Sequence, residues 1–271
     1  MTVSSFRAGV VQMTSTGDRA KNLATALRLV GEAADLGAKL VALPENFSFM
    51  GNEAERIAGA EPVDGPTIGA LRELARRRGI HVVAGSIAEK VDAPGKTANT
   101  SVLLDDGGEI VASYRKIHLF DVAIPDGARY AESETVAPGE RPVLAETALG
   151  RIGLTICYDL RFPELYRALA AQGADVLTIP AAFTLFTGKD HWEVLVRARA
   201  IENQAYVLAP AQVGRHSANR VTFGNAMVVD PWGVVLARCP DGEGVAVAEV
   251  RRDRIEQVRR EVPALTHRKL C

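Results

Sequence analysis

The sequence is poor in cysteine: the 271 residues include only Cys157, Cys239 and Cys271. Their number is odd and no two are spaced as Cys-x-x-Cys, which argues against a disulfide framework and a structural zinc site. We therefore expect a cytoplasmic protein without a metal. Aromatic residues make up only 6% of the chain, and no basic stripe is interleaved with them. A nucleic-acid partner is accordingly not expected.

Long apolar runs are also missing. No segment approaches the roughly 18 apolar residues that a membrane span needs, and residues 1–13 lack the pattern of a secretory signal. We therefore expect no membrane partner. Apolar residues make up 47% and charged residues 24%, with a net charge of −1, as in an ordinary globular protein. Because no linker or low-complexity tract interrupts it, the chain is predicted to form one domain over residues 1–271, with a C-terminal tail from about residue 262.

Short apolar segments alternate with amphipathic ones along the chain. The apolar segments predict strands at residues 6–13, 39–43, 81–87, 100–104, 109–114, 143–146, 151–156, 176–179, 206–211, 225–230, 234–238 and 245–250. The amphipathic segments predict helices at residues 19–36, 66–78, 163–173, 189–204 and from 252 onward. Hairpins are interspersed with strand–helix repeats, so the pattern favours an α/β fold with mixed sheets. The polar segment at residues 121–141 is long for a loop inside a compact domain, which is typical of functional loops.

The stretch around Cys157 is predicted to be a strand, a sharp turn and a helix. An apolar run at residues 152–156 ends at the cysteine, and Pro163 suits the first position of the helix that follows. A thiol near the N–H groups of a helix start is typical of a nucleophile with a lowered pKa and a nearby oxyanion site. On its own, however, Cys157 is better explained as a small apolar residue that ends a buried strand.

Glu45 and Lys116 also lie just past the ends of predicted strands. Ligands bind at that end of the sheet in α/β proteins, so the three residues together predict a catalytic set. A carboxylate can take the thiol proton and return it to a departing amine, and an ammonium can stabilise an oxyanion. A hydrolase that pairs Cys157 with His118 or His191 remains an alternative, since spacing excludes neither histidine.

Three segments carry a resemblance to a known family. They are residues 43–46 (Leu-Pro-Glu-Asn), 114–121 (Tyr-Arg-Lys-Ile-His-Leu-Phe-Asp) and 153–164 (Gly-Leu-Thr-Ile-Cys-Tyr-Asp-Leu-Arg-Phe-Pro-Glu). In order and separation they resemble the Glu, Lys and Cys signatures of the nitrilase superfamily of carbon–nitrogen hydrolases, over nearly the whole chain. The resemblance implies a four-layer αββα sandwich in a single domain. It also implies a homodimer or higher homo-oligomer, formed through the helix after the cysteine, and no cofactor.

The resemblance also implies a role for each residue of the set. Glu45 is expected to be the general base and acid, and Cys157 to form a thioester. Lys116 and the backbone N–H of Tyr158 are expected to stabilise the tetrahedral intermediate. Glu132, in the loop after the lysine strand, matches a second glutamate that orients the substrate and Lys116.

Residues beyond the cysteine resemble particular branches of the superfamily. The sequence at 158–164 is similar to two small-amide branches, the ω-amidases acting on α-keto dicarboxylate monoamides and the amidases that repair deaminated glutathione. Gly214-Arg215-His216 favours the second branch. The expected substrate is a small amide that carries a carboxylate. Nitrile hydrolysis and acyl transfer are alternatives, and the intact catalytic set argues against a non-catalytic interaction protein.

A substrate carboxylate needs a cationic partner. Arg215 is the predicted partner, although a structural role explains it about equally well. Arg161 is a weaker candidate, because an ion pair with an acid such as Glu164, or with one across a dimer interface, explains it better. Phe183 and Thr184, after the strand at residues 176–179, are expected to wall the pocket.

Overall fold

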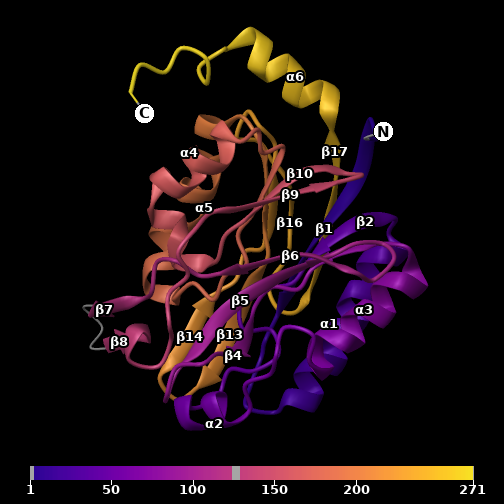
Figure 1. Cartoon of the computed structure of the whole chain (residues 1–271). Coiled ribbons are helices and arrows are strands. Elements are labelled where there is room, and N and C mark those ends of the chain that lie inside the picture. The colour runs from indigo at the N-terminus through magenta and orange to yellow at the C-terminus, as the bar shows by residue number, and fades with distance from the viewer. Residues whose placement is uncertain (1–2, 124–128, 271) are drawn as a thin grey trace.

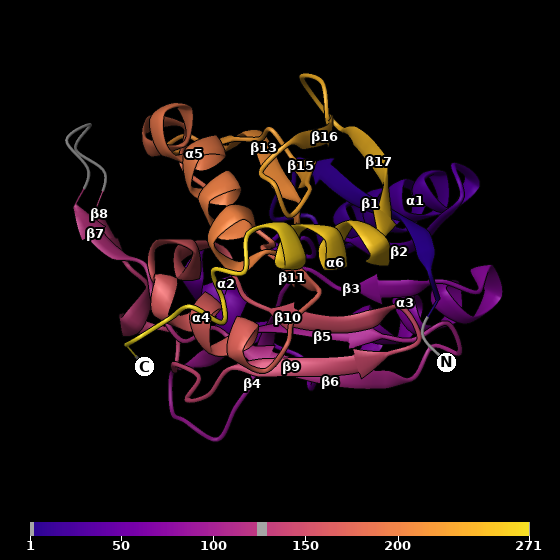
Figure 2. The same cartoon turned by 90° about the horizontal axis from the view of Figure 1, so that it is seen from above.

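The computed structural model describes residues 3–123 and 129–270. Two β-sheets pack face to face, and helices cover their outer faces (Figures 1 and 2). The helices are α1 (Arg19–Asp35), α2 (Glu53–Ala58), α3 (Pro66–Arg78), α4 (Pro163–Ala171), α5 (Leu185–Asn203) and α6 (Arg252–Glu261). Two short 3₁₀ helices are Glu132–Glu134 and Cys157–Arg161.

Strands of the described residues form two large sheets and one small hairpin. The first sheet runs in the order β14 (Arg220–Phe223), β13 (Ala211–Ser217), β1 (Ser5–Met13), β2 (Ala38–Ala42), β3 (His81–Val83), β5 (Thr97–Leu104) and β4 (Ile87–Lys90), with β17 (Gly244–Arg251) beside β1 and β6 (Ile110–Arg115) beside β5. The second runs in the order β16 (Val235–Arg238), β15 (Met227–Val229), β12 (Tyr206–Ala209), β11 (Val176–Thr178), β10 (Gly150–Leu154) and β9 (Val143–Thr147). The hairpin is β7 (Asp121–Ala123) with β8 (Arg129–Ala131).

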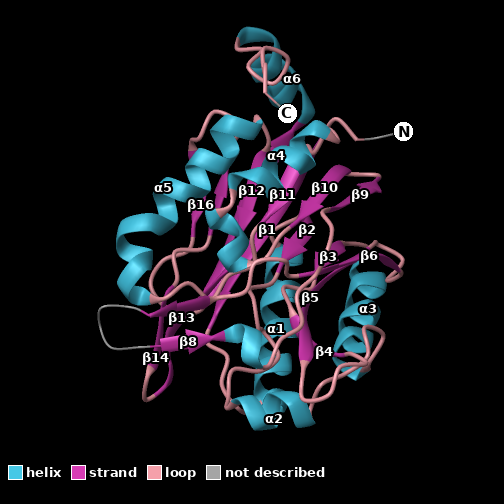
Figure 3. Ribbon diagram, turned by 60° about the vertical axis from the view of Figure 1, so that its left-hand side comes forward, coloured by secondary structure: helices cyan, strands magenta, loops and turns pink. Residues whose placement is uncertain are grey.

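Apolar side chains fill the space between the sheets. Val10 and Leu40 of the first sheet share one buried cluster with Leu154 and Leu208 of the second. A second cluster lies between the first sheet and helices α1 and α3, while α4 and α5 cover the second sheet (Figure 3). The central strands are therefore buried on both faces, which explains why they read as continuous apolar runs.

The architecture confirms the predicted αββα sandwich with mixed sheets. β1, β2 and β3 are parallel, as are β10, β11 and β12, and hairpins such as β9–β10 are antiparallel. The strand predicted at 81–87 is wrong as a single element, because the chain turns at Gly85, whose φ is 35°, between β3 and β4. In the described part of the chain, no helix is long and apolar enough to cross a membrane.

Candidate active site

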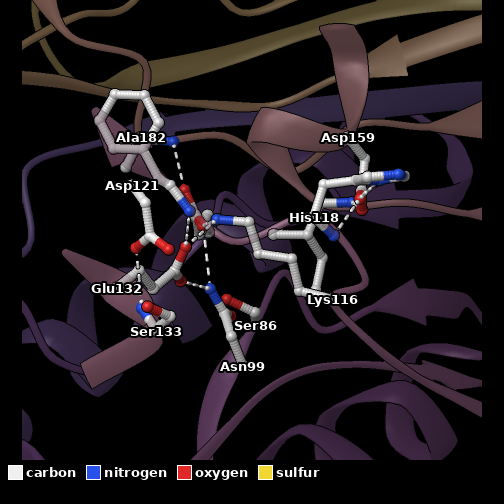
Figure 4. Close-up of polar contacts among 12 residues, drawn as sticks. Ser86, Asn99, Lys116, His118, Asp121, Glu132, Ser133, Asp159 and Ala182 are labelled. Atoms are coloured by element: carbon white, nitrogen blue, oxygen red, sulfur yellow. Dashed lines mark hydrogen bonds and ion pairs between the residues drawn. The ribbon is translucent and has the colours of Figure 1, made fainter. Parts of the chain in front are cut away.

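Four side chains and one backbone N–H form a cluster around the Lys116 ammonium, here called the Lys116 cluster. Lys116 Nζ donates to Glu45 Oε1 at 2.9 Å and to Glu132 Oε2 at 2.8 Å. Asn99 Nδ2 joins the same carboxylates, donating to Glu45 Oε1 at 2.9 Å and to Glu132 Oε1 at 3.1 Å. The N–H of Ala182 donates to the other Glu45 oxygen at 3.0 Å (Figure 4). One cation is thus held between two carboxylates from separate segments.

Burial and charge fix the protonation states in this cluster. Burial alone would lower the pKa of Lys116, but the negative charges of Glu132 and Glu45 raise it well above its usual range. Burial would raise the pKa of Glu132, yet the Lys116 charge and the Phe120 N–H, 2.7 Å from Glu132 Oε2, hold it below its ordinary value. Lys116 is therefore a cation and Glu132 a carboxylate at neutral pH.

A tight turn places Glu45 after β2. The next residue, Asn46, has a φ of 55°, and its N–H donates to Ser86 Oγ at 3.0 Å. A side chain at Gly85 would meet the Pro44 carbonyl oxygen at 2.0 Å, so only glycine allows the two segments to approach this closely. Gln212 Nε2 also donates to the Glu45 carbonyl oxygen, at 3.0 Å. Hydrogen bonds to the backbone and close packing of two segments therefore fix the position of Glu45.

Cys157 lies at the joint predicted from the sequence, three residues past the end of β10. Its φ is 46°, a left-handed conformation that non-glycine residues adopt at a cost of about 1–3 kcal/mol. The Cys157 N–H donates to the Pro180 carbonyl oxygen at 2.9 Å, which holds this turn against the end of β11. A strained turn that is fixed by neighbouring structure is typical of a functional nucleophile.

The expectation of a lowered thiol pKa is wrong. Burial raises the pKa of Cys157 well above its ordinary value, the negative charge of Glu45 raises it further, and the positive charge of Lys116 only partly compensates. The sequence placed the thiol near a helix start but could not show how deeply it is buried. The resting Cys157 side chain is therefore a neutral thiol next to a carboxylate that can accept its proton.

Asp159 connects the Cys157 turn to the segment after β6. Its side chain is fully buried and accepts the Tyr114 hydroxyl at 2.7 Å and the Ile156 N–H at 2.8 Å. The other carboxylate oxygen accepts the His118 N–H at 3.1 Å and lies 2.7 Å from His118 Nδ1 (Figure 4). One carboxylate thus joins the Cys157 turn to the segment that carries Lys116, although no role was predicted for it.

The histidines weighed as partners for the thiol are engaged elsewhere. The His118 ring contacts Asp159 and stacks on Phe162, with centroids 3.7 Å apart. His191 Nδ1 lies 3.3 Å from the Arg161 guanidinium. Neither ring lines the cavity that contains Cys157. The geometry favours Glu45 over a histidine as the base.

The cavity over the Lys116 cluster has a volume of about 460 Å³. Its floor includes Glu45, Lys116 and Cys157, and aromatic rings of Phe120, Tyr130 and Tyr158 line one side. Other lining residues come from the segment before α2 and from α2 itself, from the start of α5 and from β14, among them Met50, Arg56, Thr187, Arg220, Val221 and Thr222. A cavity of this size accommodates a small organic molecule.

Known proteins are similar to this chain in sequence and in fold. The chain matches the carbon–nitrogen hydrolase family over residues 7–260. It belongs to that family. The deaminated glutathione amidase of Synechocystis sp. strain PCC 6803 is 49% identical over 266 residues, with 97% of this chain and 98% of the relative covered. The mouse enzyme of the same name is 47% identical over 267 residues, covering 96% and 82%. The crystal structure of Saccharomyces cerevisiae Nit3, a member of branch 10 of the nitrilase superfamily, superposes with a TM-score of 0.89 at 32% identity, covering 99% and 98%.

Three of the five residues that were predicted to bind the substrate line the cavity of the hydrolase, and the two arginines do not. Tyr158, Phe183 and Thr184 line the cavity. Arg215 does not: it is exposed and donates to the Ala218 carbonyl oxygen at 2.9 Å within its own hairpin. Arg161 also lies outside the cavity lining, over the Phe183 ring at 5.1 Å. Their placement offers no support for either arginine as the partner of a substrate carboxylate.

Asn99 is a member of the Lys116 cluster that sequence reasoning missed. It lies in β5, within the segment Thr-Ala-Asn-Thr-Ser at 97–101, and every residue of that segment is buried. Polar residues inside a strand with apolar neighbours were a usable signal, because a buried amide needs partners. Without the structure, those partners could not be named.

His216, in the Gly-Arg-His segment, is buried and neutral in the folded hydrolase. Burial lowers its pKa from 6.5 to about 4. Nδ1 lies 2.7 Å from the Ser15 carbonyl oxygen, which can only accept, so this nitrogen carries the proton. Nε2 lies 2.7 Å from Thr222 Oγ1 and must therefore accept the hydroxyl proton.

Acid should destabilise the protein through His216. Because the unfolded chain takes up a proton below pH 6.5 and the folded chain only near pH 4, folding stability falls as pH drops through this window. The loss from this group is about 3 kcal/mol by pH 4. Urea unfolding at pH 7 and pH 4.5 should show a smaller drop for His216→Gln than for the wild type. Equal drops would contradict a neutral, buried His216.

Proposed function

We propose that this hydrolase cleaves the amide bond of deaminated glutathione through a thioester on Cys157. Two observations support the assignment. The Lys116 cluster places a base and a cation in the same cavity as the thiol, and relatives covered along nearly all of this chain carry that activity in their names. The cavity geometry supports the mechanism, and the names of the relatives support the choice of substrate.

The acylation step follows from the protonation states. Glu45 accepts the thiol proton as Cys157 Sγ attacks the amide carbon, and the carbonyl oxygen becomes an oxyanion. Lys116 faces this oxyanion, as does the N–H of Tyr158 at the start of the 3₁₀ helix, where N–H groups have no partner within the helix. Glu45 then gives its proton to the amine nitrogen, the C–N bond breaks, and the amine leaves.

Deacylation uses the same residues with water as the nucleophile. Glu45 takes a proton from the water, the hydroxide oxygen bonds to the thioester carbon, and the C–S bond breaks. The proton returns to sulfur, so the thiol is restored and the product is a carboxylic acid. Glu132 and Asn99 remain hydrogen-bonded throughout and keep Lys116 and Glu45 in place. We assign Phe183 and Thr184 to the wall that contacts the substrate.

A comparison of three substrates tests the assignment. Deaminated glutathione should give a higher kcat/KM than α-ketoglutaramate, by about tenfold or more if its extra carboxylate makes one charged contact. A simple aliphatic nitrile should give no product. Faster turnover of α-ketoglutaramate would identify an ω-amidase instead, and nitrile hydrolysis would overturn the amidase assignment. Added hydroxylamine would reveal acyl transfer as a hydroxamate.

The assembly and location are proposed on separate grounds. A homodimer is supported by exposed apolar side chains on α5 and the turn after β15, with Val194 66%, Ile201 50% and Trp232 49% exposed. A mass near twice 29.0 kDa in solution would support it, and a monomer would oppose it.

A cytoplasmic location is supported by Cys157 and Cys239, both free and buried.

A further inference from the structure

Some of the charged groups that line the cavity are ion-paired, whereas three of them, Arg129, Glu134 and Arg220, form no ion pair with any described residue. Lys116 is neutralised by its two glutamates, and Arg56 Nε pairs with Glu53 at 2.8 Å. Arg220, on β14, lines the same cavity but forms no ion pair or side-chain hydrogen bond with any described residue. Arg129 and Glu134 are exposed, whereas Arg220 is partly buried.

An unpaired, partly buried guanidinium is an energetic cost to the free protein. Removing a charge from water is unfavourable unless an opposite charge compensates for it. The charge is close enough to oppose protonation of His216, which lies on the same hairpin. Arg220 is therefore available to a ligand that brings its own negative charge, and bidentate pairing with a carboxylate suits its geometry.

Thr222, two residues along the same strand, adds a hydrogen-bond acceptor to this wall. Thr222 lines the cavity, and because its hydroxyl proton is donated to the neutral His216, its oxygen can still accept a hydrogen bond. The bridge between Thr184 and Thr222 fixes the strand against the loop before α5. A cation beside an acceptor matches the C-terminal end of a peptide, where a carboxylate follows a peptide N–H.

The order of the reaction decides which part of the substrate reaches this wall. The acyl group stays bonded to the buried Cys157, while the amine must depart before water attacks. The amine portion therefore extends toward solvent, where the partly exposed Arg220 lies. In deaminated glutathione the departing amine is a dipeptide with a free carboxylate.

We propose that Arg220 binds the terminal carboxylate of the departing dipeptide, while Thr222 accepts a hydrogen bond from its peptide N–H. This inference rests on the proposed function and deepens it, because it explains how a substrate that releases a dipeptide is distinguished from one that releases ammonia. Arg220 is thus a specificity-determining residue and takes the place in which the sequence predicted Arg215.

Three amides and two matched variants test the proposal. The amides are deaminated glutathione, its C-terminal carboxamide and α-ketoglutaramate, which share the acyl group and differ in the leaving amine. Arg220→Gln should lower kcat/KM for deaminated glutathione by about 10- to 100-fold, mainly through KM, because one charged contact is lost. It should change the other two rates by less than about threefold, as neither amine carries a carboxylate. Arg215→Gln, the same change outside the cavity, should alter none of the three.

The outcomes separate this inference from the proposed function. Equal losses on all three amides would overturn it, because Arg220 would then act on the acyl group or on the fold, and so would an effect confined to Arg215→Gln. If the wild type does not cleave deaminated glutathione, the proposed function fails. Inhibition of α-ketoglutaramate hydrolysis by cysteinylglycine then decides the inference: it is supported if Arg220→Gln weakens this inhibition at least about tenfold, and overturned if it does not.

Discussion

Replacing Cys157 by alanine is expected to lower kcat by roughly 10⁴- to 10⁶-fold, the range seen when a covalent nucleophile is removed. No other group at the floor of the cavity can form the acyl intermediate, since Lys116 is a cation held by two carboxylates. The change removes one sulfur atom, so the folding free energy should shift by no more than about 1–2 kcal/mol. Product formation and urea unfolding measure the two quantities separately.

Cys239 provides the matched control for that substitution. It is also buried and free, but its sulfur lies 3.9 Å from the Val10 carbonyl oxygen and does not line the cavity. Cys239→Ala should therefore keep full activity at a similar cost in stability. An active Cys157→Ala protein, or an inactive Cys239→Ala protein that is folded, would contradict the assignment of the nucleophile.

The pH dependence of alkylation checks the resting state of Cys157. Because its pKa is raised well above the ordinary value of 9.0, the thiolate fraction at neutral pH is small and grows with pH. The rate of iodoacetamide modification at Cys157, followed by mass spectrometry, should keep rising up to and beyond pH 9. A plateau below pH 7 would show a resting thiolate and would contradict the neutral thiol that Glu45 deprotonates during attack.

The sequence alone predicted three residues that the structure brings to one cavity, because of where they lie relative to strands. Glu45 and Lys116 follow strands of the first sheet and Cys157 follows a strand of the second, and the ends of these strands meet at one cavity. The resemblance to a known family added Glu132, which lies in a loop without a periodic pattern. Its contact with Lys116, at 2.8 Å, depends on how that loop folds back after β8.

Other features depend on tertiary packing and could not be predicted from the spacing of apolar and polar residues. Arg215 and Arg220 lie three and eight residues after Gln212 in one hairpin, and only the register of β13 against β14 decides which of them lines the cavity. The helix α5 begins at Leu185 and not at 189, because Thr184 Oγ1 accepts the Thr187 N–H. The short helix α2 was not predicted for a different reason. It has a capping residue, Asn52, but is too short to show an amphipathic period.

Replacing Lys116 by methionine should remove both activity and stability, and the two losses can be separated. The lysine is the cation proposed to stabilise the oxyanion, so its loss should lower kcat/KM by at least roughly 10²- to 10³-fold. It also leaves Glu45 and Glu132 buried without a counterion, which is expected to destabilise the fold by about 3–5 kcal/mol. A fall in activity alone would therefore be ambiguous between catalysis and unfolding.

The pH dependence of stability resolves that ambiguity. In the wild type the Lys116 charge holds the pKa of Glu132 below its ordinary value, so this group loses stabilising free energy as pH falls. In Lys116→Met the charge is gone, and burial should raise the pKa of the same carboxyl. The folded variant then binds more protons than the unfolded chain, so its stability should increase as pH falls from 7 to 5, opposite to the Glu132 contribution in the wild type.

A double variant completes the test. Lys116→Met combined with Glu132→Gln removes one of the two uncompensated charges, so urea unfolding at pH 7 should recover a substantial part of the lost stability. Activity should not return, because the cation that faces the oxyanion is still absent. If the double variant were active, Lys116 would be needed only to neutralise buried carboxylates. If stability stayed low, the electrostatic account of the Lys116 cluster would be wrong.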